Sequence, residues 1–296
     1  MVAQMDFGKT LGITANVICT RLDTAGYFFI KNAGFQCVDF NLQRGFFEPD
    51  SLNFRVDIEK VVLDHKSAIE NVGLKISQTH APYYFLDSHI KNLADFERYL
   101  QCVMESIDIT AELGTKYLVL HPFFLTSGLE ELQTTQTAFN LKYLADLTEY
   151  AQRKNISVAL ENLPYDFCGN TSSHRHLIET LARPNVEACF DTGHSLIIEG
   201  EHAPNHAADM SDLIRVVHLH DNDGRRDIHW HIDTKKKVWL KIMSVLLANK
   251  NLATLSLETS GVYKTCRAED IPSELSEDFR SITNILHEAK KKHDTF

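Results

Sequence analysis

Short apolar runs alternate with longer amphipathic stretches along the whole chain. Runs such as "LGITANV" and "KYLVLHPFF" have the length of strands and are largely apolar. Strands of this kind are buried on both faces, which is typical of a parallel sheet covered by helices. The eight strands are predicted at residues 11–17, 35–41, 75–82, 116–124, 156–163, 186–195, 214–222 and 253–260.

The amphipathic stretches predict helices between the strands. Their apolar residues recur at helical spacing, as in residues 93–114 and 129–155. Two of these helices end on a glycine, Gly73 and Gly114, which suits the left-handed conformation that commonly follows the last helical residue. A shorter helix is predicted at residues 205–214.

Eight strand–helix units in succession predict an α/β fold that closes into a (β/α)8 barrel, the TIM-barrel fold. The chain length of 296 residues suits one such barrel, so a single domain is predicted over residues 1–296. A doubly wound open sheet is the alternative, but no Gly-x-Gly-x-x-Gly motif follows the first strand. The chain also lacks a linker or a low-complexity tract that would separate two domains.

Charge and composition limit the partners of the chain. The formal net charge of −10 leaves no excess of positive charge for a polyanion, which counts against nucleic acid. No apolar run reaches about 18 residues, so no membrane span is expected. The first residues lack the cationic and apolar segments of a signal peptide. The six cysteines are scattered without a Cys-x-x-Cys pair, which is typical of reduced thiols and predicts a cytoplasmic protein.

Acids and histidines follow the predicted strands where each strand ends. In a (β/α)8 barrel the carboxyl ends of all strands meet at one mouth, where catalytic groups lie. The residues expected to converge there are His80, His121, Glu161, Asp191, His194, His218, Asp221, Asp227, His229 and Glu258. Any one of them alone could be a hydrogen-bonded structural residue or a salt-bridge partner, so the hypothesis depends on their meeting.

Several carboxylates and imidazoles cannot share a dry mouth without a compensating cation, so the set predicts a metal centre. Nitrogen and oxygen ligands without thiolates favour zinc, manganese, cobalt or iron. The two glutamates, Glu161 and Glu258, could also face each other across a substrate and transfer a proton.

Other histidines are expected to lie outside this centre. His220 is predicted to point to the face of its strand opposite to that of His218. The remaining ones lie in helical or loop context and are expected to be solvated, namely His174, His176, His202 and His206. The aromatic stretch "PYYF", residues 82–85, predicts packing at the mouth.

The motifs from the third predicted strand to the eighth resemble those of the xylose-isomerase-like TIM-barrel superfamily. The resemblance rests on "THAPYYFLD", "LVLHPFF", "ALEN", "FDTGHS", "VVHLHDNDGRRDIHWHI" and "LSLET", in order and at the expected spacing. This superfamily holds sugar-phosphate isomerases and epimerases, ketose 3-epimerases and abasic-site nucleases of the endonuclease IV type. The resemblance therefore implies the barrel fold, a divalent-metal site and a small-molecule sugar or sugar phosphate as the substrate.

The ketose-epimerase branch implies one ion bound by Glu161, Asp191, His218 and Glu258. In that branch the two glutamates act as acid and base, and a proton moves through an enediolate intermediate. His194 would bind substrate hydroxyl groups.

The nuclease branch implies up to three ions and phosphoester hydrolysis at abasic sites in DNA. All of its ligand positions are filled in this chain, because His80, His121, His194, Asp227 and His229 add to the four residues of the epimerase branch. If only one ion is bound, His80 is expected to bind substrate instead.

Two departures separate this chain from these branches. After "DIHWHI" the family usually has a Gly-x-Gly turn, where this chain reads "DTKKKVW", so a different covering of the mouth is expected. Phe167 stands where the ketose 3-epimerases place a further glutamate. Arg225 lies near a plausible phosphate position and is predicted to bind substrate or to lie at the surface. The last helix is amphipathic enough for core packing or for a homo-oligomer contact, and both stay open.

Overall fold

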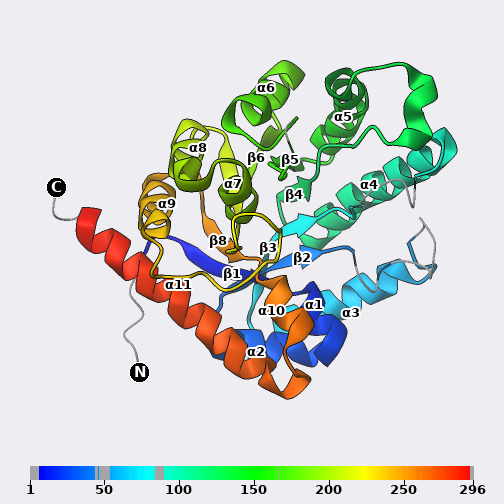
Figure 1. Ribbon diagram of the computed structural model, residues 1–296. Helices are drawn as coiled ribbons and strands as arrows, with labels where there is room; N and C mark the ends of the chain where they lie inside the picture. The colour runs from blue at the N-terminus through cyan, green and yellow to red at the C-terminus, as the bar shows by residue number, and fades with distance from the viewer. Residues whose placement is uncertain (1–6, 44–45, 47–53, 84–89, 166, 294–296) are drawn as a thin grey trace.

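The computed structural model describes residues 7–43, 46, 54–83, 90–165 and 167–293. Within these residues eight parallel strands pair in chain order, and β8 pairs with β1 to close the barrel (Figure 1). The strands are β1 (Thr10–Thr14), β2 (Cys37–Asn41), β3 (Lys75–His80), β4 (Tyr117–Leu120), β5 (Ser157–Glu161), β6 (Val186–Asp191), β7 (Ile214–Leu219) and β8 (Thr254–Leu257). The predicted (β/α)8 barrel is confirmed.

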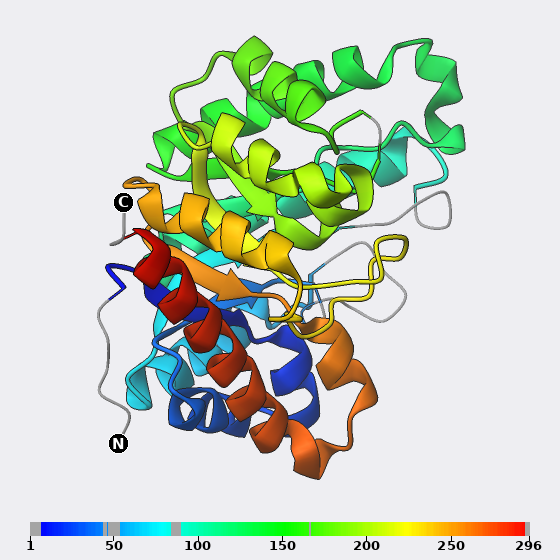
Figure 2. The same ribbon diagram turned by 60° about the vertical axis from the view of Figure 1, so that its left-hand side comes forward.

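Helices surround the barrel, and the loop that follows β7 lies at the carboxyl ends of the strands (Figures 1 and 2). The α-helices are α1 (Asn16–Leu22), α2 (Ala25–Ala33), α3 (Ile58–Asn71), α4 (Leu93–Leu113), α5 (Gln136–Arg153), α6 (Thr171–Leu181), α7 (Thr192–Ile198), α8 (Ala203–Asp209), α9 (Lys237–Ala248), α10 (Ser260–Thr265) and α11 (Ile271–His293). Three short 3-10 turns are η1 (Ser127–Leu132), η2 (Gly200–His202) and η3 (Ala268–Asp270).

Local sequence signals explain where several helices begin and end. Asn92 and Asn170 accept hydrogen bonds from the first turns of α4 and α6, because a side-chain oxygen there satisfies a backbone N–H that has no partner in the helix. Gly73 and Gly114 have φ of 72° and 75°, as the glycine rule predicts.

The sixth strand is shorter than the predicted run of residues 186–195. Asp191 ends β6, and its carboxylate accepts a hydrogen bond from the backbone N–H of His194 at 2.7 Å, so Asp191 caps α7. His194 therefore lies in a helix and not at a strand end. An aspartate at this position ends a strand because its side chain accepts a hydrogen bond from a backbone N–H of the following turn, which stabilises the start of a helix.

The barrel interior is filled by small side chains below the mouth. Val119, Ala159, Cys189 and Val216, from β4 to β7, form a buried cluster inside the barrel. Since successive side chains of a strand alternate between its two faces, the residue two positions further on points to the same interior. Glu161 follows Ala159 at this interval, and each of the other three strands continues in the same way.

The larger core lies between the barrel and the helices. The apolar side of α11 packs there, with Leu275, Ile282 and Leu286 almost fully buried, so this face serves the core. Among the described residues, none of the helices combines the length and the apolar character that crossing a membrane requires.

The prediction of solvated helical histidines is wrong for two of the four. His174 in α6 and His206 in α8 are fully buried. The Nε2 of His174 lies 2.9 Å from the carbonyl of Leu160, and the Nδ1 of His206 lies 3.0 Å from the hydroxyl of Ser195. Both helices pack their histidines toward the barrel wall, which the isolated helix sequence does not reveal. His176 and His202 are exposed, as expected.

Candidate metal centre

Four buried ligand-type side chains meet at the mouth of the barrel. Glu161, Asp191 and His218 stand at or near the ends of β5, β6 and β7, and Glu258 follows β8. One ligand atom from each lies within 4.8 Å of the others. The Nδ1 of His218 is 3.2 Å from Glu161 Oε1 and 3.1 Å from Glu258 Oε2. We call these residues the first group.

A second group shares one acid with the first. The Nε2 atoms of His80 and His121 both lie 3.2 Å from Glu161 Oε2. The two oxygens of Glu161 therefore face different groups, Oε1 toward His218 and Oε2 toward the pair of histidines. A carboxylate in this position could bridge two ions.

A third group lies beside the first, between α7 and the loop after β7. Asp227 Oδ2 is 3.2 Å from His194 Nε2 and 3.1 Å from His229 Nε2. The geometry also brings His220 into this group. Asp227 lies in the loop after β7 and reaches the mouth, as the sequence predicts.

The prediction for His220 is wrong. Its side chain is fully buried on the mouth side, with Nε2 at 3.1 and 3.0 Å from the two oxygens of Asp191 and its ring stacked on that of His229. Residues two apart in a strand share a face, so His220 follows His218 toward the mouth. Correct use of the two-residue period would have found it.

Hydrogen bonds to backbone carbonyls orient three of the histidines. The Nδ1 atoms of His80, His194 and His229 lie 2.7, 2.8 and 2.9 Å from the carbonyls of Ala81, Asn162 and Glu258. A carbonyl can only accept, so Nδ1 carries the proton and donates. Nε2 is then the nitrogen aimed at a carboxylate, which is the usual orientation of a histidine that ligates a metal.

The charges of the first and second groups are strongly coupled. Burial raises the pKa of the Glu161 carboxyl, but the imidazoles of His218 and His121 outweigh burial and hold that pKa well below its usual range. Burial likewise lowers the pKa of His80, and Glu161 reverses the effect and raises it. The imidazoles around Glu161 therefore favour its ionised form.

The third group behaves in the same way. Burial lowers the pKa of His194, but Asp191 and Asp227 outweigh it and raise this pKa to about 10. For His229, Glu258 and Asp227 overcome burial and raise the pKa to about 9. A cation that binds here must displace these protons, so its affinity rises with pH.

The donor set fits a divalent transition metal. Carboxylate oxygens and imidazole nitrogens dominate all three groups. Cys189 Sγ lies 3.8 Å from His218 Nδ1, but burial raises the pKa of this thiol. Burial thus disfavours the thiolate, the form of cysteine that binds metal ions.

The loop after β7 is held by polar contacts where the family has glycines. Asp221 and Trp230 pair as an isolated antiparallel bridge. The Asp221 carboxylate also accepts from Lys236 Nζ at 2.7 Å and Trp239 Nε1 at 2.9 Å. A β-carbon on Gly261 would overlap the carbonyl of Ile228, so this loop packs closely on α10. The loop thereby fixes His229 and Asp227 without the Gly-x-Gly turn.

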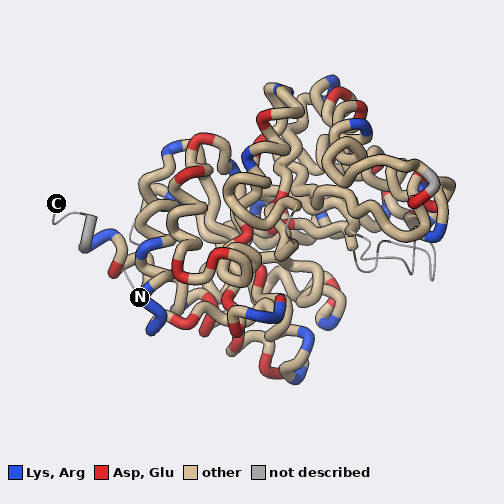
Figure 3. The backbone as a smooth tube through the Cα atoms, turned by 45° about the horizontal axis from the view of Figure 1, so that its top comes forward, with Lys and Arg blue, Asp and Glu red and all other residues tan. Residues whose placement is uncertain are grey.

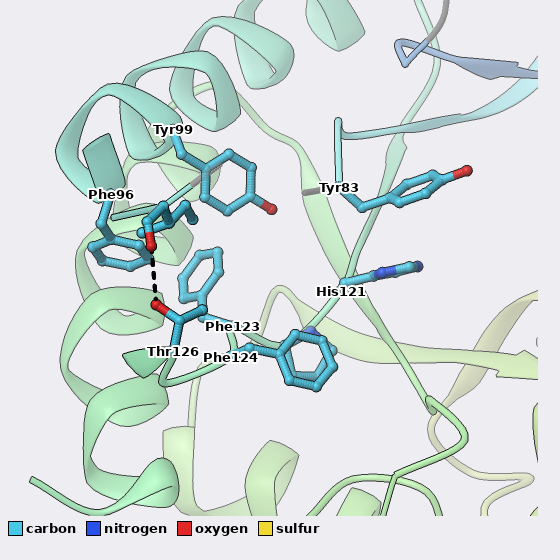
Figure 4. A pocket seen from close by; sticks show the side chains of 9 residues that line it. Tyr83, Phe96, Tyr99, His121, Phe123, Phe124 and Thr126 are labelled. Carbon is cyan, nitrogen blue, oxygen red and sulfur yellow. Dashed lines mark hydrogen bonds between the residues drawn. The ribbon is translucent and has the colours of Figure 1, made fainter. Parts of the chain in front are cut away.

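Aromatic side chains line one side of the mouth. Figure 4 shows Tyr83 and His121 side by side, and their rings stack at 4.9 Å between centroids. Phe123 turns away toward Phe96 and Tyr99 in the core. The packing predicted for "PYYF" is thus seen for Tyr83, while residues 84–85 lie outside the described part of the chain.

Two residues complete the comparison with the sequence. Arg225 is exposed on the loop after β7, outside the three groups, and its substrate-binding role stays a prediction.

The sequence analysis missed Asp39, which is fully buried in β2. Its Oδ2 lies 2.8 Å from Nε2 of His218. A charged residue within the apolar run "FQCVDFN" is the signal that could have revealed it.

A closed parallel barrel with acids and imidazoles clustered at the carboxyl ends of its strands defines an α/β barrel protein with a candidate metal centre. The chain belongs to the family described as xylose isomerase-like TIM barrel, whose model matches residues 29–283.

The chain is similar to several proteins that carry different names. "Uncharacterized protein MJ1311" of Methanocaldococcus jannaschii is 23% identical over 67% of this chain and 69% of its own length. "Probable endonuclease 4" of Mesomycoplasma hyopneumoniae is 25% identical over 74% of this chain and 84% of its own length. The solved structure of an L-ribulose 3-epimerase has a TM-score of 0.71 at 17% identity and covers 97% of both chains. At this identity the structural likeness shows the shared fold.

Proposed function

We propose that the protein is a metal-dependent isomerase or epimerase of a sugar or sugar phosphate. The observation that carries the proposal is the position of Glu161 and Glu258, which approach Nδ1 of His218 at 3.2 and 3.1 Å from different strands. Two carboxylates so placed can flank one carbon of a substrate bound between them. The names of structural neighbours such as L-ribulose 3-epimerase and D-psicose 3-epimerase support this general kind of reaction.

The first group would hold the ion through Glu161, Asp191, His218 and Glu258. A bound divalent ion would supply charge stabilisation for the oxygen atoms of a carbonyl and a neighbouring hydroxyl group. Glu161 and Glu258 would act as base and acid, one removing a proton from the substrate carbon and the other returning one, so that the substrate passes through an enediolate.

Other mouth residues would bind the rest of the substrate. His80 and His194 offer imidazole nitrogens beside the first group, where they can contact hydroxyl groups of a small sugar. Arg225, exposed on the nearby loop, would contact a phosphate if the substrate carries one. The loop after β7 and the stacked pair of Tyr83 and His121 would limit water at the reacting carbon.

The test is exchange of a substrate proton with solvent deuterium. The purified protein is incubated with divalent metal and a panel of ketoses and ketose phosphates in D2O, and deuterium in the sugar is measured by NMR. Glu161→Gln and Glu258→Gln should each reduce the exchange rate by at least about 100-fold, because a positioned acid or base contributes that much.

Glu187→Gln is the matched control for a buried carboxylate. Glu187 is half-buried on β6 and pairs with Arg215 at 3.2 Å, away from the mouth. Its exchange rate should stay within about twofold of the unmodified protein. Exchange that persists in Glu258→Gln would refute the acid–base roles.

A metal-dependent phosphoesterase acting on abasic-site DNA is the second candidate. The presence of all three ligand groups supports it, as do relatives named "Probable endonuclease 4". Two observations count against a DNA substrate. Lys and Arg are interspersed with Asp and Glu along the described chain (Figure 3), and the net charge is −10. Metal-dependent nicking of an abasic-site duplex that weakens as salt is raised would favour this candidate over the isomerase.

A further inference from the structure

Asp39 lies below the mouth, inside the barrel, and is fully buried in β2. Its Oδ2 accepts hydrogen bonds from His218 Nε2 at 2.8 Å, from Gln78 Nε2 at 3.2 Å and from Thr14 Oγ1 at 3.3 Å. A buried carboxylate is costly unless it is paired, and the charged partner available to Asp39 here is the imidazole of His218.

The two ring nitrogens of His218 therefore face two different sets of acids. Nε2 points down to Asp39, whereas Nδ1 points up to Glu161 and Glu258. Gln78 Nε2 also lies 3.1 Å from Nε2 of His218, and its N–H groups donate to Asp39. Because a carboxylate can only accept, Asp39 is the shared acceptor of Gln78 and of His218, and Nε2 carries a proton as long as Asp39 is ionised. The lone pair left for a cation is then the one on Nδ1, on the side of the first group.

This orientation is the reverse of that in the neighbouring histidines. In His80, His194 and His229 a backbone carbonyl holds the proton on Nδ1 and leaves Nε2 for the mouth. His218 instead directs Nδ1 at the first group, so the acceptor that orients its ring has to contact Nε2. The orienting acceptor must come from the barrel interior, and Asp39 supplies it.

We propose that Asp39 is a positioning residue that holds the proton on Nε2 of His218 and so directs Nδ1 to the ion of the first group. The proposal rests on the proposed function in so far as it requires an ion there. A carboxylate behind a metal-bound histidine raises its basicity and fixes its ring, and loss of such a partner typically costs about 10- to 100-fold in metal affinity.

The experiment is a titration of the metal-free full-length protein with Co2+, followed by visible absorption. Asp39→Asn removes the charge and presents an amide that can either donate or accept, so it no longer holds the proton on Nε2. We expect one binding step to weaken by about 10- to 100-fold and the spectrum of that step to change, because the ligand geometry changes. Thr14→Val is the matched control, since it removes a contact to the same Oδ2 and leaves the imidazole contact; its affinities should stay within about twofold.

Three outcomes are decisive. Co2+ binding by Asp39→Asn with unchanged affinity and spectrum would overturn the role of Asp39 while leaving the proposed function intact. A protein without substitutions that fails to bind Co2+ would refute the metal centre and the proposed function with it. If Asp39→Asn does not fold, the nitrogen chemical shifts of histidine are measured by 15N NMR in the unsubstituted protein loaded with Zn2+. We expect His218 to show a protonated Nε2 and a metal-bound Nδ1. A metal-bound Nε2 and a protonated Nδ1 would refute the proposal.

Discussion

Gly193, in the first turn of α7, lies directly against the ring of His220. A β-carbon at position 193 would overlap the imidazole. The close approach lets the His220 ring reach both oxygens of Asp191, the residue that caps the same helix. The glycine of "DTGH" thus leaves room for the ring of a histidine that follows β7, and no positive φ requires it.

Gly193→Ala should destabilise the protein by about 1–3 kcal/mol, since overpacking of a filled interior has a cost of that size. In a protein that already carries His220→Ala, the space is free, and the same substitution should be close to neutral because alanine favours a helix. The free energies of unfolding of the four proteins, measured in urea, give the coupling. Equal effects of Gly193→Ala in both backgrounds would contradict the contact.

At the scale of the elements, α6 and α8 each bury a histidine that does not belong to the mouth. Burial lowers the pKa of His174 to about 4 and that of His206 to about 3. The unfolded chain binds a proton at each position near its ordinary pKa of about 6.5, whereas the folded protein does not. The contribution of these two histidines to the free energy of unfolding is therefore fully present above about pH 6.5. It is lost as the pH falls from about 6.5 toward their pKa values in the folded protein.

Replacing His206 by leucine should flatten the pH dependence of unfolding between about pH 6.5 and 4.5. The slope should fall by up to about 1.4 kcal/mol per pH unit, the value for one proton. Ser195→Ala is the control, because it removes the hydrogen-bond partner of His206 and keeps the titrating ring. A slope that is the same with and without His206 would show that this ring is protonated in the folded state.

At the scale of the whole molecule, the barrel gathers several carboxylates, which repel one another unless protonated imidazoles or bound cations offset their charge. Removal of metal with EDTA should therefore lower the melting temperature. Saturation at about 100 times Kd contributes roughly 2.7 kcal/mol, which corresponds to about 4 °C for a domain of this size.

Elemental analysis of the same samples gives the number of ions, for which we predict between one and three per chain. A value close to one would assign the ion to the first group and leave the second and third groups as substrate contacts. A value close to three would favour the nuclease-like arrangement. A melting temperature that is insensitive to both EDTA and added metal would contradict the metal centre.

Periodicity and chain order were sufficient to predict the barrel, because each strand–helix unit carries its own local signal. The same reasoning brought Glu161, Asp191, His218 and Glu258 to one mouth, since residues at the ends of parallel strands converge whatever their exact rotamers. It assigned His194 to a strand that runs to residue 195, whereas the capping contact at Asp191 ends the strand four residues earlier and starts a helix. The prediction for His220 was also wrong, because residues two apart in a strand point to the same face and not to opposite faces.

The amino-acid sequence alone determined the fold and the approximate position of the candidate ligand residues. Hydrophobic spacing is a local property of each strand and helix, and the barrel forms when these elements pack together. The tertiary structure decided how those residues are oriented. Which nitrogen of His218 faces the mouth depends on Asp39, 179 positions away in the chain. The place of Asp227 depends on a loop that Asp221, Lys236 and Gly261 hold together. Such contacts join residues that no local pattern connects, so only the folded chain reveals them.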